Sequence, residues 1–210
     1  MYDANPRTHL ARAREMVDST ARLDYAKLRY AALDVRLTVE TALEEILTSC
    51  YSQYESSFAS LWRANGKMKT PSFTAAIRKQ RPDFDLKNRL VPVVLKWKKR
   101  IVDYQPLDLE RLSAIHHALG AHLHHISRYD EARSATSARQ LESLLGDAIS
   151  YLSDLLRHPR YWIEFHDADQ KLFEQVIGGK LGLDEFIRHI ETGRLKSFTI
   201  RDVHHLQEMA

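Results

Sequence analysis

Apolar side chains recur at the period of an α-helix over residues 24–47. One stripe, at about 100° per residue, consists of Tyr25, Leu28, Ala32, Val35, Val39, Ala42 and Ile46. A second stripe, Leu33 and Leu37, lies well round the same cylinder. This pattern predicts a long helix that is covered on two sides and is central to a helical bundle.

Charged side chains lie between these two stripes, beside Leu43 and Leu47. They are Arg29, Arg36 and Glu40. Arg36 and Glu40 are four residues apart and can form an ion pair, which is how charges are tolerated where water is scarce. The pair has two interpretations: it fixes the orientation of the helix, or it also supports an active site.

Two more long helices are predicted further along the chain. The first covers about residues 107–127, with a core face of Leu112, Ile115, Leu119, Leu123 and Ile126. The second begins at a capping box formed by Ser137 and Gln140, and it ends before Pro159.

The remaining segments are predicted to be shorter elements. Residues 64–106 are interrupted by Gly66, Pro71, Pro82, Pro92 and Pro106, which favours short helices and turns. Residues 161–165 and 196–200 are typical of short strands, and residues 173–193 of two short helices joined by glycines. We therefore expect a mainly α protein with a helical bundle over residues 1–158 and a small C-terminal α+β extension over residues 159–210.

Composition is typical of a chain that folds by itself. It has 210 residues, of which 44% are hydrophobic, enough to build a core. The single cysteine, Cys50, excludes an internal disulfide and a cysteine-rich metal site. Because no run of eighteen apolar residues and no apolar stretch of a signal peptide are present, we expect a cytoplasmic protein without a membrane segment.

Positive charge is concentrated in one segment, residues 62–100. This segment has twelve Lys and Arg against two Asp, a net charge of +10, whereas the rest of the chain sums to −7. Basic residues with aromatic ones are typical of a surface that binds phosphates and stacks on bases; the alternative is a solvated basic loop. The predicted RNA-binding residues are Lys67, Lys69, Arg78, Lys79, Lys96, Trp97, Lys98, Lys99 and Arg100.

Histidines are concentrated in the second long helix, where residues 111–125 hold five of the eleven in the chain. His117 and His124 share a stripe with Ser113 and Gly120, two small residues that let another helix approach closely. If that helix belonged to a second copy of the chain, these histidines would gather in a two-fold interface.

The chemistry of these histidines has three interpretations. Metal binding is not expected, since only His122 and His125 stand three apart and no third ligand is evident. General acid–base chemistry on RNA is the second, because a histidine can take a proton from a ribose 2′-hydroxyl while an arginine stabilises the phosphorane charge. In the third, the histidines only line a helix interface.

Two stretches of the chain resemble the HEPN superfamily, the helical domains of many RNA-cutting toxins and defence proteins. They are YAALDVRLTVETAL, residues 30–43, and LSAIHHALGAHLHH, residues 112–125; the resemblance covers residues 20–157. It implies a HEPN-like four- or five-helix bundle that dimerises, with a composite site between two copies. It also implies metal-independent endoribonuclease activity without a cofactor.

The motif of this family is an arginine followed after four to six residues by a histidine. Arg111 and His116 have that spacing, although helical counting places the two side chains about 140° apart. His124 occupies the histidine position of divergent members, and no arginine stands four to six residues before it. Arg36 and Glu40 resemble the polar residues that some members direct toward the same site.

The leading hypothesis is therefore a homodimeric, metal-independent endoribonuclease, acting in toxin–antitoxin or anti-phage defence and able to bind an antitoxin or another protein. His124 would transfer protons with help from His117 or His116, and Arg36 or Arg111 would counter phosphate charge. The alternative is a non-catalytic RNA-binding, adaptor or inhibitor module acting with a partner protein, which the missing arginine favours.

Overall fold

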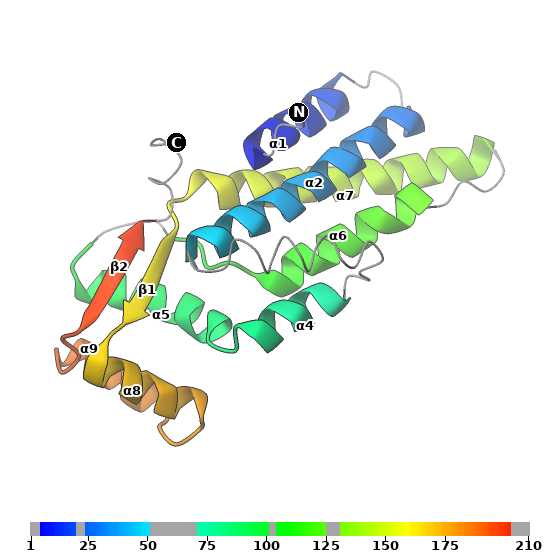
Figure 1. Cartoon of the computed structure of the whole chain (residues 1–210). Helices are drawn as coiled ribbons and strands as arrows, with labels where there is room; N and C mark the ends of the chain where they lie inside the picture. Colours follow the sequence, from blue (N-terminus) through cyan, green and yellow to red (C-terminus); the bar gives the residue numbers. More distant parts are fainter. Residues whose placement is uncertain (1–4, 20–23, 51–70, 101–103, 125–130, 203–210) are drawn as a thin grey trace. The chain divides into compact units, whose positions relative to one another are not determined.

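The computed structural model of the chain describes residues 5–19, 24–50, 71–100, 104–124 and 131–202 (Figure 1). It is mainly helical, and its strands form one two-stranded sheet in the C-terminal part, which confirms the predicted fold class. Two compact units are present. The first comprises residues 1–72 and 108–157, and the second comprises residues 73–107 and 158–210.

The first unit is a helical bundle built on one central helix. Among the described residues, its helices are α1 (Pro6–Asp18), α2 (Tyr25–Cys50), α6 (Leu109–His124) and α7 (Glu131–Arg157). Helix α2 contacts each of the other three, as expected for the central helix. Its predicted core stripe is buried from Leu28 to Ile46, with Leu28, Ala32 and Val35 fully inaccessible to solvent, while Tyr25 is half-buried.

Helix α2 is covered on a second side, as predicted, but this side is not the one that carries Leu33 and Leu37. Leu33 is 45% exposed, so the stripe that it forms with Leu37 is not a core face. The covered face instead includes Ala31, Asp34 and Thr38 and lies against α1. The prediction failed because this face carries polar residues, whose burial depends on partners supplied by α1.

Polar residues begin several of these helices. The Asn5 side chain accepts a hydrogen bond from the backbone N–H of Arg7, and Pro6 occupies the first turn of α1. The Asp24 carboxylate accepts from two backbone N–H groups at the start of α2, and Asp108 accepts from one in α6. Each cap satisfies donors that the first helical turn leaves unpaired.

Helix α7 starts earlier than predicted. It begins at Glu131, so Ser137 and Gln140 lie inside the helix and do not form its capping box. The preceding residues lack an apolar stripe, but alanine, glutamate and arginine are good helix formers, and this propensity extends the helix. The predicted end, before His158 and Pro159, is confirmed.

The second unit combines helices with the sheet. It contains α4 (Pro71–Gln80, from Phe73 onward), α5 (Phe84–Trp97), α8 (Asp167–Ile177) and α9 (Leu183–Glu191). Strands β1 (Tyr161–Phe165) and β2 (Phe198–Asp202) pair antiparallel, with Ile163 opposite Ile200. Both predicted strands and both short C-terminal helices are confirmed, β2 lying two residues later than expected.

Pro92 does not end a helix, contrary to the prediction. It lies inside α5, where it is exposed, and the helix continues to Trp97. The loss of one backbone hydrogen bond is offset by the burial of the apolar face of α5, which includes Val91 and Val94 on either side of the proline.

The core of the second unit unites two segments that the sequence analysis placed in different domains. The apolar face of α5 packs with β1, α8 and α9 through Leu90, Val91, Val94, Leu95, Ile163, Phe165, Phe173, Phe186 and Ile190. The chain does divide between residues 157 and 158, close to the expected boundary, but residues 73–107 belong with the C-terminal residues and not with the bundle. Helix α5 of the basic segment belongs to the second unit, because the C-terminal aromatic residues cover its apolar face.

No helix of the described residues is both long and apolar enough to cross a membrane.

Replacing Phe186 with alanine should strongly destabilise the second unit. Phe186 is fully buried, and its ring lies 5.4 Å from the Phe165 ring and 5.8 Å from the Phe173 ring, between centroids. We expect the free energy of unfolding to fall by about 3–5 kcal/mol, measured by urea titration with circular dichroism. Ile177→Ala is the control, because Ile177 is 41% exposed; equal losses for the two variants would contradict this core.

Candidate functional site

Three of the six predicted catalytic residues meet between α2 and α6. The His116 Nε2 atom lies 2.7 Å from Glu40 Oε1 and 3.1 Å from Arg36 Nη2, and Arg36 Nη2 lies 3.9 Å from the same Glu40 oxygen. We call Arg36, Glu40 and His116 the α2–α6 cluster. It unites the polar pair of the first long helix with a histidine of the second.

The two contacts to His116 compete for one atom. A neutral Nε2 without a proton accepts a hydrogen bond from Arg36, whereas a protonated Nε2 donates to Glu40. One nitrogen cannot do both at once. The position of a single proton therefore decides whether the imidazole is bonded to the guanidinium or to the carboxylate, as required of a group that exchanges protons.

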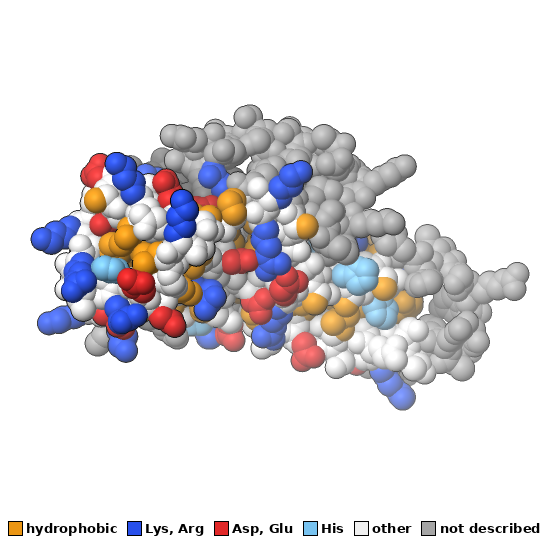
Figure 2. All heavy atoms as spheres, turned by 90° about the horizontal axis from the view of Figure 1, so that it is seen from below, with side chains coloured by type: hydrophobic (Ala, Val, Ile, Leu, Met, Phe, Trp, Pro, Cys, Tyr) orange, Lys and Arg blue, Asp and Glu red, His pale blue; other side chains and the backbone are white. Residues whose placement is uncertain are grey.

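The α2–α6 cluster is neither buried nor fully solvated. The side chains of Arg36, Glu40 and His116 are 21%, 23% and 14% exposed. In Figure 2, histidine side chains (pale blue) gather at the surface in the region of α6, next to hydrophobic ones (orange). A phosphate group could therefore reach charges whose mutual attraction is less screened than in open water.

Gly120 makes room for Arg36. A Cβ atom added at Gly120 would lie 3.5 Å from Arg36 Nη1, so the guanidinium lies directly against this glycine. The sequence analysis interpreted Gly120 as a place where another helix approaches. A helix does approach there, but it is α2 of the same chain.

The polar character of the seam continues toward the C-terminal end of α6. Arg29 Nη2 donates to the carbonyl oxygen of Leu123 at 2.7 Å, and the Tyr25 hydroxyl lies 3.5 Å from His122 Nδ1. The Nε atom of Arg29 is buried without a hydrogen-bond partner among the described residues. The predicted seam of charged residues along α2 is therefore confirmed as part of the contact with α6.

The other predicted catalytic residues are not part of the α2–α6 cluster. The Arg111 guanidinium lies over the Tyr151 ring, 4.0 Å from its centroid, and contacts α7. His117 is exposed on α6. The side chain of His124 lies outside the described residues. The Arg111–His116 motif is thus present in the sequence, but Arg111 is engaged elsewhere, as the angle of about 140° between the two positions would predict.

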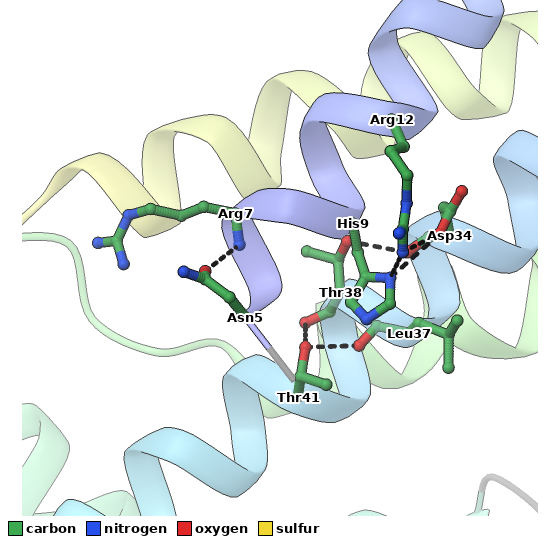
Figure 3. A network of polar contacts seen from close by, with 8 residues as sticks. All are labelled: Asn5, Arg7, His9, Arg12, Asp34, Leu37, Thr38 and Thr41. Carbon is green, nitrogen blue, oxygen red and sulfur yellow. Dashed lines mark hydrogen bonds and ion pairs between the residues drawn. The ribbon is translucent and has the colours of Figure 1, made fainter. Parts of the chain in front are cut away.

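A second polar cluster, which the sequence analysis missed, joins α1 to α2 (Figure 3). The Asp34 Oδ1 atom lies 3.1 Å from His9 Nδ1 and 3.1 Å from Arg12 Nη2, and Arg12 also contacts His9. His9 is 2% exposed and Asp34 is 9% exposed. This burial indicates a structural contact that fixes α1 on α2.

A sequence signal for this second cluster was present. Asp34 is an acid next to the buried positions Ala31, Ala32 and Val35, and such an acid needs a partner. His9 and Arg12 lie three residues apart, on one side of a helix. Nothing in the one-dimensional pattern, however, identified these two residues as the partners.

The structure describes some, but not all, of the predicted RNA-binding residues. Lys67 and Lys69 lie outside the described residues. Arg78 pairs with Asp85 at 2.7 Å, while Lys79, Lys96, Lys98, Lys99 and Arg100 are exposed. On the face seen in Figure 2, Lys and Arg side chains (blue) are interspersed with Asp and Glu (red). The two acids that the net charge of +10 already counts, Asp83 and Asp85, pair with Lys87 and Arg78.

No group of three His, Cys, Asp or Glu residues that could hold a metal ion occurs within the described ranges. In comparisons with known proteins, no family, curated protein or solved structure matches this chain.

Substitutions at Gly120 should reveal the contact with Arg36. Gly120→Ala should raise the free energy of unfolding by about 0.5–1 kcal/mol, because alanine favours helix and its Cβ fits. Gly120→Leu should lower it by about 1–3 kcal/mol, since the side chain would displace Arg36. The measurement is urea denaturation. Gly146 of α7 has open space around it, so a similar loss in Gly146→Leu would contradict the explanation.

Removing Asp34 should destabilise the contact between α1 and α2. Asp34→Ala leaves the buried His9 without its acceptor, and we expect a loss of about 1.5–3 kcal/mol in the free energy of unfolding. Thermal and urea denaturation would measure this loss. Glu44→Ala, an exposed position on the same helix, is the matched control and should change little. A loss no larger than that of the control would show that the second cluster contributes nothing.

Proposed function

We propose that this protein is a metal-independent endoribonuclease of the HEPN type, and that the α2–α6 cluster is its reaction centre. The observation that supports the proposal is the meeting of Arg36, Glu40 and His116 within hydrogen-bond and ion-pair distance. A cation, a carboxylate and an imidazole are the groups that RNA cleavage needs: one to counter phosphate charge and two to move a proton.

The proposed reaction is an internal transfer of a phosphodiester. The RNA 2′-hydroxyl loses its proton to the Glu40–His116 pair, and its oxygen forms a bond to phosphorus. The bond from phosphorus to the 5′-oxygen breaks, and the pair returns one proton to that leaving oxygen. Arg36 binds the non-bridging oxygens while negative charge builds up on them. The products are a 2′,3′-cyclic phosphate and a 5′-hydroxyl end.

The pair is suited to this exchange because its two groups share one proton at close range. Glu40 orients the imidazole through Nε2. We further propose that the active particle is a cytoplasmic homodimer, in which His117 and His124 of α6 add to the same site. An antitoxin or another partner protein would regulate it.

A second candidate function is supported by the position of Arg111. Its guanidinium is held over Tyr151, and His116 Nε2 is engaged by two side chains of the same chain. A bundle whose ion cluster only fixes α6 on α2 would bind RNA, or act as an adaptor, without cutting it. Salt-dependent binding without fragments is the expected behaviour of such a module.

His116→Gln and Glu40→Gln should each reduce RNA cleavage by about 10²–10⁴-fold, the usual contribution of a proton-transfer group. The assay is incubation of the purified chain with mixed RNA in EDTA, with fragments resolved on gels and their ends analysed for cyclic phosphate. Circular dichroism and light scattering would report the fold and the mass of the particle.

The matched control is His189→Gln, on α9 of the second unit, which should cut as well as the wild type. Full cleavage by a folded His116→Gln variant would overturn the reaction centre. Intact RNA after incubation with the folded wild type would overturn the nuclease itself and favour the non-catalytic module.

A further inference from the structure

Two basic segments that are distant in the sequence meet in the second unit. The Trp97 ring at the end of α5 lies 5.8 Å from the Phe198 ring at the start of β2, measured between centroids. Gly193, after α9, lies against Trp97 as well, since a Cβ added there would be 3.7 Å from the ring atom Cζ2. The end of α5 and the loop between α9 and β2 are therefore neighbours.

Both segments carry exposed cations and no acid. Residues 94–100 and 192–200 contain no Asp or Glu. Their exposed basic side chains are Lys96, Lys98, Lys99, Arg100, Arg194 and Lys196. We call these six, with the Trp97–Phe198 ring pair, the Trp97 surface. Only the four cations at and after the end of α5 were predicted from the sequence, because nothing in the sequence placed residues 194–196 beside Trp97.

The loop that supplies Arg194 and Lys196 is held by a buried acid. Asp169 is 6% exposed, and its Oδ2 atom accepts hydrogen bonds from the backbone N–H groups of Lys196 at 2.7 Å and Ser197 at 2.5 Å. The Asp169 carboxylate thus binds backbone N–H groups of the loop. Because these hydrogen bonds fix the loop, its basic side chains extend from a defined backbone conformation.

The α5 side of the surface is also defined. Lys98 Nζ lies 4.8 Å from the Trp97 ring centroid and 5.1 Å from that of Phe198, so the ammonium is positioned by two aromatic rings. Lys99 adopts a left-handed φ of 54°, and the Arg100 N–H closes the helix on the carbonyl of Leu95. Cations at a helix C-terminus are favoured by the helix dipole.

We propose that the Trp97 surface binds the phosphate backbone of single-stranded RNA. This inference rests on the proposed ribonuclease function and identifies where its substrate is held. Basic side chains around aromatic rings are the arrangement by which proteins bind single strands without reading sequence. The two segments that supply the cations contain no Asp or Glu themselves, which suits a polyanion, and the exposed Asp167 carboxylate beside the loop accepts a hydrogen bond from the Ser197 hydroxyl.

The test is the salt dependence of binding to a fluorescein-labelled 2′-O-methyl oligouridylate, followed by fluorescence anisotropy. The methyl group blocks the 2′-oxygen, so the wild-type chain cannot cleave this probe. If all six cations contact phosphates, the slope of log K against log salt is about −4, at about 0.7 per contact for single strands. Arg194→Ala/Lys196→Ala should change the slope to about −3 and weaken binding at low salt.

The matched control is Lys171→Ala/Lys180→Ala, which removes two exposed cations of the same unit that belong to neither segment. It should leave the slope unchanged. Equal weakening by both double variants would show an effect of net charge alone and would overturn the surface, as would no binding by the wild type at low salt.

The two proposals can fail separately. In one case, the wild type cuts no RNA while Arg194→Ala/Lys196→Ala still binds the probe more weakly than the control variant. This result would support the Trp97 surface and reject the nuclease. In the converse case, RNA cleavage depends on His116 while Arg194→Ala/Lys196→Ala leaves the slope of log K against log salt unchanged. This result would support the nuclease and reject the Trp97 surface.

Discussion

The need to pair the charges of α2 is the constraint on which the first unit depends. This central helix carries Asp34 on one side and Arg36 with Glu40 on another, and each charge must find a partner when neighbouring helices cover it. His9 and Arg12 of α1 meet Asp34, and His116 of α6 meets Arg36 and Glu40. Apolar burial alone would allow α1 and α6 to shift along α2, whereas these contacts require one position.

The same chemical set serves two purposes in the two clusters. Each consists of a histidine, an arginine and an acid, with one imidazole nitrogen facing both charges. In the cluster with His9, the side chains of His9 and Asp34 are only 3% and 12% exposed, and Arg12, at 42%, covers them from the solvent side, which suits a structural contact. The cluster with His116 remains accessible enough for a phosphate to approach. The two clusters differ in the solvent access of the proton-exchanging groups rather than in residue type, since Glu40 and His116 are 23% and 14% exposed and Asp34 and His9 only 12% and 3%.

The second unit depends on an aromatic core that joins distant segments. The rings of Phe165, Phe173 and Phe186 contact one another in pairs, and these residues pack against the apolar face of α5. Because α5 packs there, its basic end comes beside the loop before β2. The location of positive charge in this unit is therefore a consequence of how the core packs, and it includes cations from outside the basic segment.

Several features of the protein were determined by the sequence alone. Helical periodicity predicted the mainly α fold, the central helix α2 and its charged seam, because amphipathic patterns are local and survive folding. Short strands and glycine-linked helices after Pro159 were also predicted from local patterns. The start of α7 and the passage of α5 through Pro92 were not, since propensity and packing overrode the local signals there.

Only the tertiary structure decided which residues are partners. The spacing of Arg111 and His116 suggested a pair, but their side chains point in different directions round the helix, and Arg36 of another helix occupies the place beside His116. The partner of Asp34 and the neighbours of Trp97 were likewise undetermined. A sequence records which side chains share a face of one element; contacts between elements depend on packing across many residues at once, and no local pattern encodes them.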